Sequence, residues 1–177
     1  MTGTAHSALL KRFWPGEEEY PVWGVFDGAR HAAVHSTLLN SYMEQACLYA
    51  GDLAFEVERN APHLVKLEAR DRTAKELIEQ AWGKSWGIFA QSRESLFALR
   101  THFRRLLVVR DSGGRKLLFR FYDPRVLRAY LPTCNAEELK TVFGPVETFW
   151  MEARNPGELL QFRVRQGQLV KEALPLT

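Results

Sequence analysis

The sequence predicts an α/β domain in which a mixed β-sheet is flanked by helices and extended by a C-terminal antiparallel meander. Three observations predict it: short β-branched or aromatic runs end at Asp, Gly or Pro, apolar residues recur with helical period between them, and the final third alternates apolar with polar residues. With 177 residues, 46% hydrophobic and 25% charged, the chain has the size and composition of one globular domain. We expect a loosely held lead-in at residues 1–20 and a single domain at residues 21–177.

The first half of the domain is expected to alternate strands and helices. Val22–Phe26 predicts a buried strand that ends at Asp27, His31–Tyr49 predicts a helical region, and His63–Leu67 predicts a second strand. The clearest helix follows, because its apolar residues repeat at the spacing of one buried stripe. These residues are Ala74, Leu77, Ile78, Ala81 and Trp82.

Capping residues delimit that helix and the next. Thr73 and Glu76 fit a capping box, Asp71 offers an earlier cap, and Gly83 suits the left-handed residue that ends a helix. After a strand at Ser85–Ala90, Ser92 is expected to cap a further helix. Its inward residues are expected to be Leu96, Leu99, Phe103 and Leu106, and its outward residues Arg100, Arg104 and Arg105.

A hairpin and a strand-to-helix junction come next. Leu107–Asp111 and Lys116–Tyr122 bracket the turn Ser112–Gly114, and both runs are apolar enough to predict central strands. Asp123 then offers a carboxylate to the first free amides of a helix that begins at Pro124.

The C-terminal part predicts one more helix and the meander. Asn135 and Glu138 form a capping-box pattern, and Gly144 with Pro145 ends that helix. Three strands are expected at Val146–Ala153, Leu159–Arg165 and Leu169–Leu174. Because Leu160, Phe162 and Val164 alternate with Gln161, Arg163 and Arg165, the meander is expected to have one buried and one wet face.

Catalytic motifs are missing, so no catalytic, cofactor-binding or metal-binding residue is predicted. The best candidate for an enzyme is Cys134, because a thiol just before a helix could have a depressed pKa and could meet His63 or His102; a half-buried, inert cysteine is the favoured alternative. Asp27 and Asp123 could form an acid/base pair, but turn and cap roles explain them better. The helical pair His31 and His35 lacks the further ligands of a zinc site.

Positive charge is concentrated in one segment. Residues 91–130 contain ten Lys or Arg against three Asp or Glu, a net +7, while the rest of the chain contains fourteen against eighteen, a net −4. This cationic band could attract an acidic protein, a small anion or nucleic acid. Known nucleic-acid signatures, membrane spans and a secretory signal are not found in the sequence, so we expect a cytoplasmic protein that binds neither nucleic acid nor membrane.

Six residues are singled out as a candidate partner-binding or structural motif. Trp86 could anchor a partner, whereas Trp82 fits the core stripe. Asp123 is expected to hold the strand-to-helix turn. Arg104, Arg120 and Arg125 are expected either to brace that turn through buried ion pairs or to engage a partner's carboxylates, bracing being favoured. The six are Trp86, Arg104, Arg120, Tyr122, Asp123 and Arg125.

Six ordered segments resemble a known family: VFDGAR (25–30), APHLVKLE (61–68), WGKSWGIFAQS (82–92), LRTHFRRLLVVRD (99–111), LLFRFYDPRVLRAYLPTC (117–134) and FGPVETFWME (143–152). Over Pro21–Ala153 the chain is similar to the adaptor chaperones of type VI secretion, first catalogued as a domain of unknown function.

The resemblance implies a non-enzymatic bacterial protein that binds one cognate toxic effector in the cytoplasm and helps to load it onto the VgrG spike protein. It also implies an α/β lobe that is often followed by a mostly helical second lobe. Because the residues after Glu152 predict only a β meander, that second lobe is expected to be absent here. An anion- or nucleic-acid-binding regulatory module is the second hypothesis, and a cysteine-dependent enzyme is the third.

Overall fold

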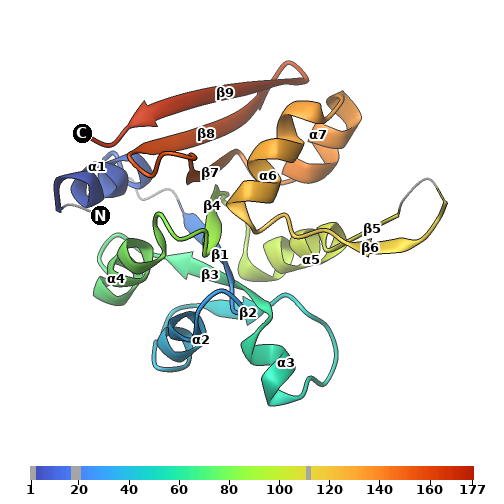
Figure 1. Ribbon diagram of the computed structural model, residues 1–177, viewed down its shortest axis with the longest axis horizontal. Helices are drawn as coiled ribbons and strands as arrows, with labels where there is room; N and C mark the ends of the chain where they lie inside the picture. The colour runs from blue at the N-terminus through green and yellow to red at the C-terminus, as the bar shows by residue number, and fades with distance from the viewer. Residues whose placement is uncertain (1–2, 17–20, 111–112) are drawn as a thin grey trace.

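The computed structural model describes residues 3–16, 21–110 and 113–177, and within them one seven-stranded sheet carries most of the fold (Figure 1). Its strand order is β2-β3-β1-β4-β7-β8-β9, and every described pairing is antiparallel. The strands are β1 (Val22–Asp27), β2 (Gln45–Cys47), β3 (Pro62–Leu67), β4 (Gly87–Gln91), β7 (Thr148–Glu152), β8 (Glu158–Arg165) and β9 (Gln168–Pro175). The predicted α/β class with a C-terminal meander is confirmed, whereas the sheet, expected to be mixed, is antiparallel in every described pairing.

Helices cover both faces of this sheet, and each face has its own apolar core. The helices are α1 (Gly3–Phe13), α2 (Ala32–Leu39), α3 (Phe55–Arg59), α4 (Arg72–Ala81), α5 (Leu96–Leu106), α6 (Pro124–Tyr130), the 3-10 helix η1 (Leu131–Thr133) and α7 (Ala136–Phe143). The first core gathers Phe103, Phe121 and Phe149 under α5, α6 and α7. The second gathers Phe13, Phe26 and Trp150 with residues of α1, α2 and α4.

The meander is buried on both faces in its first half, so the expected wet face is wrong there. Leu160 and Phe162 join the first core, while Leu159, on the opposite face of β8, joins the second. Gln161 is also buried, and it accepts a hydrogen bond from Trp150 Nε1 at 3.0 Å. The alternation of apolar and polar residues in β8 correctly predicted which face of the strand joins the first core. It could not reveal that α1 covers the opposite face.

Residues 3–13 of the predicted lead-in form helix α1, so the prediction of a loosely held segment is wrong there. Leu9 and Phe13 lie four residues apart on one helical face and are fully buried. The Phe13 ring lies 4.7 Å from Phe89 and 5.2 Å from Trp150, measured between centroids. Residues 1–2 and 17–20 of the predicted lead-in lie outside the described residues.

The region His31–Tyr49 is not one helix. Helix α2 ends at Leu39, and Asn40 donates a side-chain hydrogen bond to the Ser36 carbonyl at 2.8 Å. The chain then forms β2, which pairs with β3 at the edge of the sheet. Side-chain competition for the last helical carbonyls, followed by edge pairing, therefore overrides the helical tendency of this region.

The helix caps agree with most of the sequence predictions. Asp71, the earlier of the two candidate caps, accepts hydrogen bonds from the amides of residues 73 and 74. Asp123 caps α6, and Asn135 with Glu138 forms the predicted capping box of α7. Ser92 does not cap α5: its buried hydroxyl donates to the Pro145 carbonyl at 2.8 Å, and Ser95 is the cap.

The predicted central strands instead form a separate two-stranded hairpin, β5 (Val108–Arg110) and β6 (Lys116–Leu118). Figure 1 shows this hairpin extending away from the main sheet beyond α5. The central positions are taken by β1, β4 and β7, so the prediction of central strands is wrong. The residues after Leu118 lead directly to the Asp123 cap. Asp111, the predicted end of the first strand, and Ser112, the predicted start of the turn, lie outside the described residues.

Candidate functional site

Three buried carboxylates lie around one end of the sheet. Asp27 ends β1, Glu152 ends β7, and Asp123 caps α6. The register places the end of β1 beside the start of β4, and β4 pairs in turn with β7. We call these three carboxylates, together with Arg120, Tyr122 and Arg125, the junction cluster. Its members are Asp27, Arg120, Tyr122, Asp123, Arg125 and Glu152.

Asp27 and Arg120 join β1 to the segment before α6 across 93 positions of sequence. Arg120 donates to Asp27 Oδ2 at 2.6 Å, and the Ala29 amide donates to Oδ1 at 3.1 Å. The hydrogen bond and charge of Asp27 raise the pKa of Arg120. The guanidinium also lies 5.9 Å from the centroid of the Tyr122 ring. One cation therefore neutralises a buried carboxylate and covers a buried ring.

Asp123 and Arg125 form the second ion pair. Arg125 donates its amide and Nε to Asp123 Oδ1 and a terminal nitrogen to Oδ2, at 2.9, 3.0 and 2.6 Å. Burial alone would raise the pKa of Asp123, but the hydrogen bonds and charge of Arg125, with Arg30 nearby, hold it below its ordinary value. The same carboxylate thus caps α6 and binds a guanidinium in a bidentate manner.

Tyr122 and Arg104 both lie beside the end of β2 and the residues that follow it. Burial and the neighbouring Tyr49 and Asp27 raise the pKa of the Tyr122 phenol. Arg104 donates to the carbonyls of Cys47, Leu48 and Tyr49, so α5 is tied to this loop. Burial, with a contribution from Arg100, lowers the pKa of Arg104. The head group of Arg104 therefore binds backbone oxygens at the end of β2 and just after it, and not the Asp123 turn that it was predicted to brace.

Glu152 was not among the predicted site residues, and it holds the turn between α4 and β4. Its carboxylate accepts hydrogen bonds from the Gly83 amide at 2.6 Å, the Ser85 amide at 3.0 Å and the Ser85 hydroxyl at 2.8 Å. Gly83 and Ser85 both have positive φ, at 80° and 56°. The sequence offered one signal for this role, an acidic residue at the end of an apolar strand. Its hydrogen-bond partners lie 67 and 69 positions away in the sequence, so they could not be predicted from it.

The two tryptophans of this turn are both buried. Trp82 packs in the core as predicted and donates to the Pro156 carbonyl at 2.7 Å. Trp86 stacks on His31 at 4.7 Å, with Lys84 5.0 Å from its ring centroid. Its exposed fraction is 5%, so the side chain is part of the core rather than the open anchor that the sequence suggested.

The cysteine and histidine candidates are each hydrogen-bonded to a different backbone carbonyl. Burial raises the pKa of the Cys134 thiol, which donates to the Tyr130 carbonyl. The depressed pKa that the enzyme hypothesis needs is thus contradicted, and Cys134 is half-buried as the favoured alternative predicted. His102 pairs with the Val142 carbonyl and His63 with the Glu58 carbonyl, each at 3.0 Å. Within the described ranges, no three His, Cys, Asp or Glu side chains are grouped to hold a metal ion.

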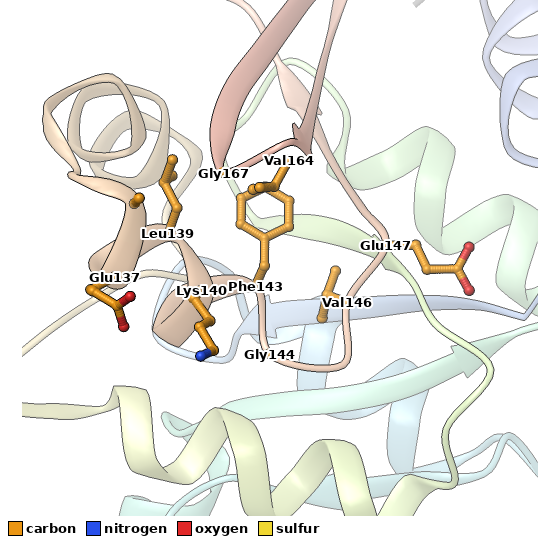
Figure 2. Close-up of a pocket in the computed structure, with 10 residues that line it drawn as sticks. Glu137, Leu139, Lys140, Phe143, Gly144, Val146, Glu147, Val164 and Gly167 are labelled. Atoms are coloured by element: carbon orange, nitrogen blue, oxygen red, sulfur yellow. The ribbon is translucent and has the colours of Figure 1, made fainter.

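An open groove of about 400 Å³ lies between α7 and the turn that joins β8 to β9. Figure 2 shows Phe143 against Val164 in this groove, with Glu137 and Lys140 projecting from α7. Both signs of charge line it, so its electrostatics favour no single class of ligand.

Exposed apolar residues gather on the β5–β6 hairpin. Val108, Val109, Leu117 and Leu118 are 51%, 38%, 46% and 55% exposed. We call these four residues, with Arg110 and Lys116, the hairpin surface. A groove of about 240 Å³ adjoins it. Its lining combines the apolar residues Leu106, Val109, Phe119, Tyr130 and Val142 with the polar residues Asn135, Glu137, Glu138 and Thr141.

Together these features define an antiparallel α/β domain whose buried carboxylates brace the strand ends and whose exposed apolar residues collect on a projecting hairpin. Residues 22–141 match the family described as Domain of unknown function (DUF4123). The match covers more than half of the chain, and the protein belongs to this family. Comparison with curated proteins and with solved structures finds no match. None of the described helices is both long and apolar enough to cross a membrane.

Proposed function

We propose that this protein is a non-enzymatic adaptor and chaperone of a bacterial type VI secretion system, which binds a cognate toxic effector in the cytoplasm and loads it onto the VgrG spike. The single observation that supports this most is the family match over residues 22–141, because the family is associated with that system. The matched region contains the whole β5–β6 hairpin and all of the junction cluster except Glu152.

The chemistry of the described side chains favours binding over catalysis. Asp27 and Asp123 are occupied by arginines, and the Cys134 thiol has a raised pKa. A reaction would need a nucleophile, a base and a stabiliser within reach of one another. By contrast, an exposed apolar surface on a rigid domain is typical of protein recognition.

The same contacts weigh against the anion- or nucleic-acid-binding alternative. Arg104 binds carbonyls, and Arg120 and Arg125 bind carboxylates, so three cations of the basic band have partners within the domain. Phosphate binding relies on cations that can exchange their counterions for the nucleic-acid backbone.

Co-purification tests this proposal. The tagged chain is expressed in its host with the products of the genes that flank its own, purified at moderate salt, and analysed by mass spectrometry. We expect a toxin-like or VgrG-like protein in stoichiometric amount, and the same recovery with the Cys134→Ala variant. Recovery of nucleic acid alone, or of no partner, would contradict the adaptor function, and a loss of a turnover on Cys134→Ala would favour the enzyme.

A further inference from the structure

The β5–β6 hairpin exposes aliphatic side chains that an isolated domain would be expected to bury. All six of its strand positions are exposed, and four of the six residues are Val or Leu. In the described chain the two strands pair only with each other. A two-stranded hairpin alone is marginally stable in water, and clustered exposed apolar residues mark interaction sites.

The register sorts these residues onto two faces. Val108 pairs with Leu118 and Arg110 with Lys116, so these four side chains share one face, in which an aliphatic pair lies next to a cationic pair. Val109 pairs with Leu117 on the opposite face. A partner on the first face would therefore meet apolar and positive surface side by side.

The second face continues into the body of the domain. Val109 belongs to the groove that Leu106, Phe119, Tyr130 and Val142 also line. Its volume of about 240 Å³ is below the ~300–1,000 Å³ of small-molecule pockets and suits one or two apolar side chains. The groove therefore lies on the side of the hairpin opposite to the Val108–Leu118 and Arg110–Lys116 pairs.

Charge complementarity selects the occupant of this surface. The charged residues of the first face are the exposed Arg110 and Lys116, whereas Glu137 and Glu138 line the groove on the other side of the hairpin. A second copy of the chain would bring a surface of the same charge, and nucleic acid would leave Val108 and Leu118 without apolar contacts. An acidic segment that also carries apolar side chains satisfies both parts of the surface.

We propose that the first face of the hairpin surface, formed by Val108, Leu118, Arg110 and Lys116, binds an acidic, apolar segment of the cognate effector. This inference rests on the adaptor function proposed above and names the contact that carries it. The apolar side chains of the segment pack on the Val108–Leu118 pair, and its carboxylates face Arg110 and Lys116.

The test uses the full chain and the effector encoded beside its gene, with affinity measured by titration. One variant removes the apolar pair (Val108→Ser with Leu118→Ser), and a second reverses the charged pair (Arg110→Glu with Lys116→Glu). The apolar control is Leu39→Ser with Val57→Ser, whose side chains are 65% and 46% exposed on α2 and α3. The charge control is Arg72→Glu on α4, whose side chain is 90% exposed.

Both hairpin variants are expected to weaken effector binding by about tenfold or more, as hot-spot truncations do, while the two controls and all thermal midpoints stay near the wild type. Charge reversal is also expected to reduce the salt dependence of the affinity. A photoreactive residue at position 118 is expected to cross-link to an acidic segment of the effector.

The outcomes separate this inference from the proposed function. Binding that is equal for all four variants, or a cross-link to the VgrG spike alone, overturns the hairpin inference and leaves the adaptor function intact. If the wild-type chain does not bind the effector, both fall. Capture of nucleic acid through Arg110 and Lys116 instead of the effector also overturns both.

Discussion

The ion pair between Asp27 and Arg120 is predicted to stabilise the fold by coupling two distant segments, which a double-mutant cycle can measure. The variants are Asp27→Ala, Arg120→Ala and the double variant. The pair is short, at 2.6 Å, and asymmetric, because the Asp27 side chain is 2% exposed and the Arg120 side chain is 42% exposed. The hydrogen bond from Ala29 to Asp27 is lost wherever Asp27 is replaced, so it cancels in the cycle.

The expected coupling follows from this partial burial. Two unit charges about 4 Å apart near a protein surface interact by ~4 kcal/mol, whereas pairs between exposed side chains contribute ~0.2–1 kcal/mol. Since solvent reaches the guanidinium but not the carboxylate, the value should lie between these limits, at about 1–2 kcal/mol. Arg120→Ala should therefore cost more stability than a typical surface substitution, because it leaves Asp27 buried without its cation.

Urea unfolding of the four proteins gives the coupling free energy, provided that the denaturant slope is the same for all. The matched control is the ion pair Arg59–Glu56, at 2.9 Å and with side chains 44% and 68% exposed, whose cycle should give about 0.3 kcal/mol. A coupling for Asp27 and Arg120 no larger than that of the control would refute the bracing argument.

Three further predictions concern stability and titration. Glu152→Ala should lower the free energy of unfolding by about 3 kcal/mol, because it leaves the Ser85 turn without its acceptor; a urea-derived loss below ~1 kcal/mol would contradict this role. Gly144→Ala should cost about 2 kcal/mol or more, since φ is +49° and the new Cβ would lie 2.4 Å from His102; an unchanged thermal midpoint would disprove it. Burial lowers the pKa of His63 and of His102, so NMR titration midpoints should fall below about 6.5. As the pH falls, these histidines are protonated in the unfolded chain before they are protonated in the folded one, so the free energy of unfolding should decrease below pH ~6.5. Titration midpoints at or above ~6.5 would exclude this pH dependence.

Local signals in the sequence were sufficient for most elements of the fold. The Asp123 cap, the Asn135 capping box and the meander strands are each specified by residues within a few positions of one another. Such features depend on backbone hydrogen bonds that the nearest side chains satisfy, so a single sequence reports them well.

Long-range packing is what the sequence could not report. Nothing local distinguishes an apolar strand in the centre of a sheet from one in a separate hairpin, so β5 and β6 were misplaced. The burial of α1 depends on Phe13 meeting Phe89 and Trp150. Likewise, the partners of Glu152 in the junction cluster are far away in sequence, so its role emerges only from the fold.

The proposed adaptor function is tested most directly by mixing the purified chain with the effector encoded beside its gene. The molar mass of each species is then measured by light scattering during size-exclusion chromatography. The adaptor function predicts one species whose mass is the sum of both proteins in a fixed ratio. Two separate peaks at the masses of the free proteins, at concentrations well above those in the cell, would contradict it.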